Sequence, residues 1–246
     1  MKNFSPVNSE EKEFCRHISD LTSKQSFYPR FTAFLTEREQ QLAKFTAEAT
    51  GVDCSFWGGH EAAVRRMFST PAAQPEDFPL EAVTFFFREK DKLTHRDFLG
   101  SLMSLGIKRD QIGDISITDG ASVVFASKTV IPLLGEIEKV GRVGVRQQSG
   151  ICIVLPQQEF VEISVICASN RIDAVISAVC GLSREKAAAL VKSGAAVVNG
   201  VQCVSVSENV DEGDIFSVKG YGKFIFETVG NPTKKGKNHI IIKKYK

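Results

Sequence analysis

The sequence lacks the features of a secreted or membrane-spanning protein. No run of about 18 uncharged apolar residues could span a bilayer, and the first residues, MKNFSPVNSEEKEF, have neither the basic nor the apolar region of a secretory signal. Cysteine occurs only six times in 246 residues, always singly, without the close pairs of thiolate metal sites. These absences predict a cytoplasmic protein without a membrane segment, with reduced and mostly packed cysteines and no bound metal.

Motifs of cofactor chemistry are also missing. No glycine-rich loop follows a strand, and neither a P-loop nor a synthetase-type nucleotide signature is present. The one enzyme-like cluster of the N-terminal part runs from Trp57 to Glu61, where His60 has no second ligand at helical spacing. His95-Arg96-Asp97 has no kinase motif around it and is interpreted as a helix start. We therefore expect no enzymatic activity and no cofactor.

The chain has little net charge, because its 31 Lys+Arg and 29 Asp+Glu give a formal net charge of +2. The distribution is uneven, because residues 171–246 hold 12 Lys+Arg and 7 Asp+Glu, a net +5, whereas the remainder carries −3. The balance excludes a wholly basic, histone-like protein. A polyanionic partner is predicted to prefer the C-terminal third.

The predicted fold class is α+β, beginning with a helical N-terminal segment over residues 1–79. Phe14, Ile18 and Leu21 recur at helical spacing, Phe31, Phe34 and Leu35 are assigned to the same helical segment, and EREQQLAKFTAEATG reads as a further helix. Three prolines in STPAAQPEDFP then indicate a linker. We place a domain boundary near residue 80.

Residues 80–150 follow the order βαββαβ. AVTFFFRE, GDISITDG, ASVVFAS and RVGVRQQ are predicted strands, and THRDFLGSLMSLG and TVIPLLGEIEKVG are predicted helices, the second with Pro132 in its first turn. This order is typical of a ferredoxin-like or RNA-recognition-like plait, which does not fix a function. The RNP-like aromatic signature of a base-stacking platform is absent, so RNA binding here would come from loops such as Lys108-Arg109 and from Arg142 and Arg146; solvated charge is the alternative.

A β-rich bridge over residues 151–169 precedes the C-terminal domain, residues 170–246. Two short helices are predicted after Asn170 and after Ser183, which fits an N-cap. Asn199-Gly200 and Gly213-Asp214 are predicted tight turns. Asp173 is interpreted as a cap or as the partner of an arginine. The final KKGKNHIIIKKYK is predicted to be a basic edge strand.

The stretch RIDAVISAVCGLSREKAAALVKSGAAVVNG, followed by Gly213-Asp214, resembles the RNA-binding domain named after ribosomal small-subunit protein four, an S4-like domain. The resemblance implies two short helices on a small bent sheet, with the second helix and the following hairpin facing structured RNA. Arginine and lysine suit phosphate contacts of this kind. The candidate RNA-binding residues are Arg171, Ser183, Arg184, Lys186, Lys192, Asn199, Lys219 and Lys223, with Lys243 and Lys244 as possible secondary contacts.

Almost the whole chain resembles the YlmH family of bacterial RNA-binding proteins, through WGGHEAAVRRMF, HRDFLGSLMSLGIKRDQIGDI and the C-terminal stretch. The resemblance implies a non-catalytic protein that binds rRNA or tRNA on the large ribosomal subunit, with stalled peptidyl-tRNA, in ribosome-associated quality control. Two alternatives stay open. One is an RNA-modifying enzyme with an appended RNA-binding domain, and the other is a scaffold linked to cell division that binds protein partners through residues 1–150.

Overall fold

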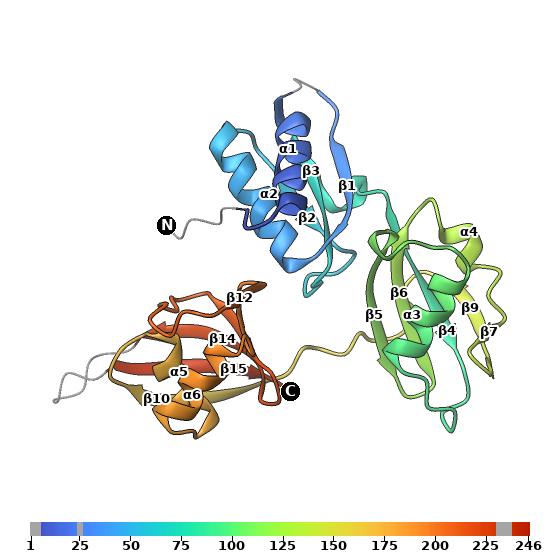
Figure 1. The fold of residues 1–246 in the computed structure, drawn as a ribbon. Coiled ribbons are helices and arrows are strands. Elements are labelled where there is room, and N and C mark those ends of the chain that lie inside the picture. Colours follow the sequence, from blue (N-terminus) through green and yellow to red (C-terminus); the bar gives the residue numbers. More distant parts are fainter. Residues whose placement is uncertain (1–5, 24–26, 230–237) are drawn as a thin grey trace. The chain divides into compact units, whose positions relative to one another are not determined.

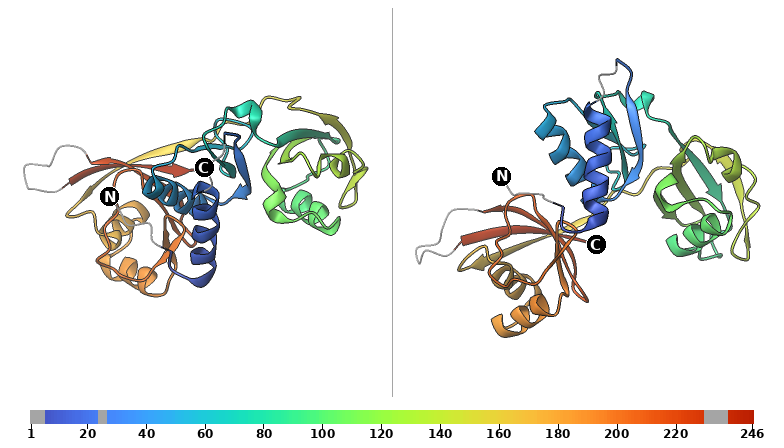
Figure 2. Two further views of the ribbon diagram at one scale, coloured as in Figure 1. Left: turned by 90° about the horizontal axis from the view of Figure 1, so that it is seen from above. Right: turned by 45° about the horizontal axis from the view of Figure 1, so that its top comes forward.

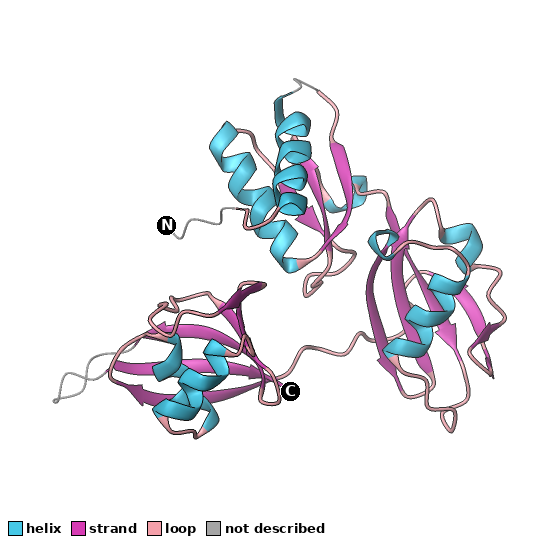
Figure 3. Cartoon of the chain, viewed as in Figure 1, coloured by secondary structure: helices cyan, strands magenta, loops and turns pink. Residues whose placement is uncertain are grey.

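The fold is that of a computed structural model, which describes residues 6–23, 27–229 and 238–246. Helices and strands are mixed along the whole of this range, which confirms the α+β class (Figures 1 and 3). The chain divides into two compact units, Met1–Gln157 and Gln158–Lys246. None of the helices in the described ranges is both long enough and apolar enough to cross a membrane.

The first unit begins with two helices and a three-stranded sheet. The helices are α1 (Ser9–Ser23) and α2 (Glu37–Thr50), and the antiparallel sheet has the order β1 (Arg30–Leu35), β3 (Arg66–Thr70), β2 (Ser55–Trp57). A capping box starts α2 at Thr36, with Glu39 as its partner. The prediction of a helical segment over residues 1–79 is therefore correct for α1 and α2 and wrong for the three strands.

The alternation expected of a half-buried strand is missing from β1 because its last two residues, which point to opposite faces, are both buried. Phe34 packs with Met67 and Phe78 on one side, whereas Leu35 joins Ile18 in a second cluster with the helices. Burial of consecutive residues removes the alternation that identifies a half-buried strand. A register shift between Phe31 and Phe34 disturbs the pattern further.

The middle of the first unit is a four-stranded antiparallel sheet with helices. Its elements are β4 (Leu80–Phe86), α3 (His95–Ser104), β5 (Ile112–Thr118), β6 (Ala121–Ser127), α4 (Ile131–Leu134) and β9 (Arg146–Ser149), with the small hairpin β7 (Lys139–Val140) and β8 (Val143–Gly144). Strand order is β5-β6-β4-β9. Two short 3-10 turns, η1 (Pro75–Asp77) and η2 (Arg109–Gln111), precede β4 and β5.

Most elements predicted for this region are confirmed. Thr94 and Asp97 form the capping box that starts α3, and Gly120, at φ 80°, turns the β5–β6 hairpin. The second predicted helix is much shorter than expected. It covers only four residues, its N-cap Val130 provides no side-chain bond, and Gly135 ends it. The remaining residues of that stretch lead from the end of α4 into strand β7.

The two sequence motifs of the first unit, WGGHEAAVRRMF and HRDFLGSLMSLGIKRDQIGDI, meet at the partly buried carboxylate of Asp114. Asp114 in β5 accepts hydrogen bonds from the backbone N–H of Val64 (2.7 Å) and Arg65 (3.0 Å). His60 Nε2 lies 3.5 Å from the same carboxylate. The Arg65 guanidinium continues the connection by donating to the carbonyls of Ile112 and Phe34. His60 is thus structural, as the sequence indicated.

Burial alone would raise the pKa of Asp114, but the nearby His60 imidazole and the hydrogen bonds from the two backbone N–H groups outweigh burial and lower it below 3.8. A carboxylate whose pKa is depressed by folding stabilises the fold above its ordinary pKa. That stabilisation is lost as the pH falls through the folded-state value. Asp114 should therefore stabilise the first unit at neutral pH and cease to do so in acid.

Asp114→Asn should lower the free energy of unfolding of the first unit by about 1–3 kcal/mol at neutral pH, because the backbone N–H groups of Val64 and Arg65 lose a charged acceptor. Urea unfolding followed by the fluorescence of Trp57, the single tryptophan, measures the effect. The difference from the unaltered protein should shrink well below pH 3.8. Asp110→Asn, at an exposed position nearby, is the control, and an equal loss in the control would contradict the role of Asp114.

The second unit is a six-stranded antiparallel sheet with two helices. Its strands are β10 (Phe160–Cys167), β11 (Ala196–Val198), β12 (Val201–Cys203), β13 (Ile215–Val218), β14 (Gly222–Val229) and β15 (Asn238–Tyr245), in the order β10-β15-β14-β13-β11-β12. Helices α5 (Ile172–Cys180) and α6 (Arg184–Lys192) lie on the same face of this sheet (Figure 2). Between the helices and the sheet lies one apolar core.

Two expectations for this unit need correction. The predicted bridge over residues 151–169 is divided, because residues 160–167 form β10 and belong to the sheet of the second unit. The predicted basic edge strand is an inner strand, because β15 pairs with β10 on one side and with β14 on the other. Its isoleucines Ile240 and Ile242 are fully buried, which explains the placement. Lys234, Lys235 and Lys237 of the same stretch lie outside the described residues.

Candidate nucleic-acid interface

The starts of α5 and α6 are joined through Asp173. Its side chain is 7% exposed and accepts hydrogen bonds from Arg171 Nε and an Arg171 terminal nitrogen, each at 3.2 Å, and from Arg184 at 2.6 Å. The two arginine side chains are themselves 41% and 48% exposed. The predicted pairing of Asp173 with an arginine is thus confirmed. One carboxylate holds two half-exposed guanidinium groups, so the ensemble keeps a net positive charge at the surface.

The electrostatics of this cluster keep Asp173 ionised. Burial alone would raise the pKa of Asp173, but donation by Arg184 and Arg171 and their positive charges outweigh burial and bring it below its ordinary value. Charge-assisted pairs of this kind are shorter and more directional than neutral hydrogen bonds. The arginines are therefore held in place before any polyanion arrives.

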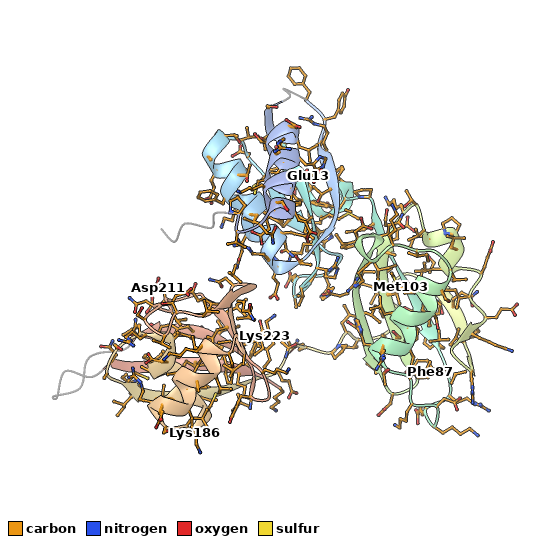
Figure 4. The ribbon with its side chains drawn as sticks, viewed as in Figure 1. Glu13, Phe87, Met103, Lys186, Asp211 and Lys223 are labelled. Atoms are coloured by element: carbon orange, nitrogen blue, oxygen red, sulfur yellow. The ribbon has the colours of Figure 1, made fainter. Side chains whose placement is uncertain are left out.

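The outer side of α6 carries two exposed lysines, Lys186 and Lys192. Ser183 is the N-cap of α6, and its hydroxyl accepts from the Lys186 backbone N–H, which confirms the predicted cap. Lys186 and Lys192 are exposed, and Figure 4 shows Lys186 projecting from α6. Among the described residues, neither lysine side chain has an ion-pair partner within 4 Å. The pair provides two free positive charges.

Asn199 is a turn residue rather than a surface contact. It is 9% exposed, adopts φ 49°, donates to Asp214 (2.7 Å) and accepts from the Ile215 backbone N–H (3.0 Å). Both side-chain groups are therefore used inside the fold. Its inclusion among the RNA-binding candidates needs correction, whereas the predicted turn at Asn199-Gly200 is confirmed.

The other basic candidates of the second unit differ in availability. Lys219 is exposed in the β13–β14 turn. The Lys223 ammonium lies 4.9 Å from the Tyr245 ring centroid, and that of Lys244 lies 5.8 Å from the Phe224 ring centroid. Lys243 donates to Glu227 at 2.8 Å. Because the last three have partners already, Lys219 is the most available of the four.

The four secondary candidates in the middle of the first unit also differ in how available their side chains are. Arg109 is half-buried, and its guanidinium donates to the carbonyls of Ile112 and Gly113. Burial lowers the pKa of Arg109, as does nearby Arg65. Arg109 is therefore structural and is corrected as a contact. Lys108, Arg142 and Arg146 are exposed, with the Arg146 guanidinium 5.5 Å from the centroid of the Phe86 ring.

Neither a metal site nor a disulfide is found in the described part of the chain. No group of three or more His, Cys, Asp or Glu side chains converges there, and all six cysteines are unpaired, with Cys152 exposed. Tyr221, an exposed aromatic residue beside α6, is missing from the candidates named from the sequence. The signal was present in Lys219-Gly220-Tyr221-Gly222-Lys223, where glycines and lysines flank an aromatic residue.

Comparison with known proteins assigns the middle of the chain to a class. Residues 73–150 match the family model described as "Putative RNA-binding domain in YlmH". This region is thus similar to a domain described as RNA-binding, and it contains the secondary candidates Lys108, Arg109, Arg142 and Arg146.

Two relatives extend the comparison beyond that domain. The chain is 28% identical over 233 residues to the "Ribosome-associated protein quality control protein P2" of Bacillus subtilis (strain 168), covering 91% of this chain and 90% of the relative. The solved structure of the cell division protein ylmH from Streptococcus pneumoniae aligns with a TM-score of 0.51 at 22% identity, over 60% of this chain and 94% of that one. This second likeness supports the fold alone. The predicted relationship to the YlmH family is confirmed.

Asp173→Asn should loosen the start of both helices of the second unit. The isosteric amide leaves two guanidinium groups without their anion, which should cost about 1–3 kcal/mol. Hydrogen–deuterium exchange at neutral pH should become faster in peptides of α5 and α6 and stay unchanged in α1 and α2. Glu185→Gln removes one negative charge from an exposed position of α6. Equal acceleration by this control would contradict a specific role for the Asp173 cluster.

Proposed function

We propose that this chain is a non-catalytic, cytoplasmic RNA-binding protein of ribosome-associated quality control. It binds structured rRNA or tRNA on the large ribosomal subunit, with stalled peptidyl-tRNA. Support comes from the RNA-binding family match over residues 73–150 and from the 91% coverage by a relative named for ribosome-associated quality control. The family description names RNA binding, the name of the relative gives quality control, and neither names an enzymatic reaction.

The observation that carries the proposal is the free positive charge of α6 beside the fixed Arg171–Asp173–Arg184 cluster. Lysine and arginine bind phosphates without reading sequence, which suits the irregular surface of folded RNA. Residues 171–246 carry a net charge of +5, whereas residues 73–150 hold ten Lys+Arg and eleven Asp+Glu, a net −1. Long-range attraction to a polyanion therefore arises in the second unit.

The proposal includes the domain classes predicted from the sequence. An S4-like domain is supported by two short helices on one face of the sheet in the second unit, with the Asn199-Gly200 turn after them. A ferredoxin-like plait is supported by the antiparallel order β5-β6-β4-β9, in which the first and third strands of the βαββαβ pattern are central. Residues 1–150 are the proposed region for protein partners.

The proposed mechanism is binding alone. Arg171 and Arg184 act as oriented forks for phosphate, and Lys186 and Lys192 act as mobile point charges on the adjacent helix. Exposed Lys108, Arg142 and Arg146 add contacts from the family-matched region. Together these groups would steady a translational intermediate, with no bond made or broken by this chain.

Lys186→Glu/Lys192→Glu should release the protein from purified bacterial large ribosomal subunits in sucrose-gradient cosedimentation. Both side chains are exposed and free, so the substitutions change charge without breaking the core. A variant of Arg184 is unsuitable, because the new carboxylate would face buried Asp173. The plot of log affinity against log salt concentration should flatten by about 0.7–0.9 for each lost phosphate contact.

The matched control is Lys12→Glu/Lys44→Glu, which changes net charge by the same amount at exposed positions of α1 and α2. It should cosediment like the unaltered chain. If both double variants bind alike, the α6 surface is not the RNA contact. If the unaltered chain fails to bind, or binds without salt dependence, the scaffold alternative is favoured.

The double variant Lys108→Glu/Arg142→Glu tests how much the family-matched region contributes to ribosome binding in the same cosedimentation assay. Both residues are exposed, and changing them leaves the buried contacts of Arg109 intact. We expect weaker binding and a flatter salt dependence, because this region carries the RNA-binding match. Unchanged binding would restrict the RNA contact to the second unit.

A further inference from the structure

A shallow apolar groove runs beside the outer surface of α6. Its volume is about 430 Å³, and its lining residues are Leu182, Lys186, Ala189, Leu190, Ser193 and Tyr221. Four of these follow the i, i+3, i+4, i+7 stripe of one helix face. Tyr221 comes from the β13–β14 turn, so two separate elements make the walls.

The β13–β14 turn is shaped to hold Tyr221 at this groove. Gly220 and Gly222 adopt φ 86° and 123°, conformations that favour glycine. The Lys219 backbone N–H donates to the Ala195 carbonyl just after α6 (2.9 Å), and that of Tyr221 donates to the Val218 carbonyl (2.9 Å). The turn is thereby fastened to the end of α6.

The lining of the groove is complementary to a flat, mostly apolar ligand that carries negative charge next to it. The Tyr221 side chain remains accessible, with the residue 37% exposed. Within the described residues its hydroxyl makes no hydrogen bond. Lys186 lines the groove, Lys219 is two residues from Tyr221, and no acidic residue is part of the lining. A nucleobase with its flanking phosphates has this combination, because every base has an apolar π-face.

We propose that the α6–Tyr221 groove binds one unstacked nucleobase of the RNA held by the second unit. The base stacks on the Tyr221 ring, its edge faces Ser193, and the flanking phosphates contact Lys186 and Lys219. The inference rests on the proposed RNA-binding function and adds a site for single-stranded or bulged nucleotides to a surface otherwise suited to phosphates. Selection for unpaired bases follows, because a base in a duplex presents no free face.

The test compares Tyr221→Ala and Tyr221→Phe in the full chain, with purified bacterial large subunits and with deproteinised large-subunit RNA as probes. Tyr221→Ala should weaken binding to both probes by roughly 5- to 150-fold, the loss expected for one base–aromatic stack. Tyr221→Phe keeps the ring and should bind within about twofold of the unaltered chain, on the same stacking argument. Because no phosphate contact is removed, the salt dependence should be unchanged in both variants. Circular dichroism melting checks that the exposed turn tolerates the substitution.

Other outcomes separate this inference from the proposed function. If the unaltered chain and Lys186→Glu/Lys192→Glu differ as proposed but Tyr221→Ala binds normally, the base site is overturned and the RNA-binding function stands. If Tyr221→Ala weakens binding to intact subunits only, the groove holds a protein side chain and the base site is again overturned. If the unaltered chain binds neither probe, both proposals fall.

Discussion

The surface of the second unit depends on the buried carboxylate of Asp173. It lies in the first turn of α5, pairs with Arg171 immediately before that helix, and reaches Arg184 at the start of α6. A buried carboxylate without partners would be unfavourable, and two unpaired guanidinium groups in contact would repel each other. The three charges therefore fix the helix pair and, with it, the positions from which Lys186 and Lys192 project.

Charge and family assignment point to different parts of the chain. The RNA-binding match covers residues 73–150, where acidic residues slightly exceed basic ones, whereas the C-terminal third carries the positive charge. In RNA binding, long-range electrostatic attraction and local shape recognition can come from different parts of a protein. The RNA phosphates attract basic residues at long range, whereas the shape of the RNA determines where the protein docks. A basic second unit and a nearly neutral middle region can thus contribute different parts of one interaction.

Local chemistry determined what the sequence could predict. Capped helix α3, the turns at Gly120 and Asn199, and the Asp173–arginine pairing were recognisable because each depends on neighbouring residues. Strand β1 and inner strand β15 were misassigned because their burial depends on distant partners. The structural roles of Arg109 and Asn199 were hidden for the same reason. A basic or amide residue shows from sequence alone that it can bind, and only the fold shows whether its bonds are already used.

The middle sheet also limits how its domain can contact RNA. Helix α3 and its core cover one face, where Val83 and Phe85 are buried. On the other face, Val123 and Phe125 pack against Ile153 and Leu155, and His60 lies over Phe125 with ring centroids 4.8 Å apart. Stacking of bases on strands requires exposed aromatic rings. Base stacking in the family-matched domain is therefore restricted to its edges and loops, and the proposed base site lies elsewhere, at the exposed Tyr221 ring beside α6.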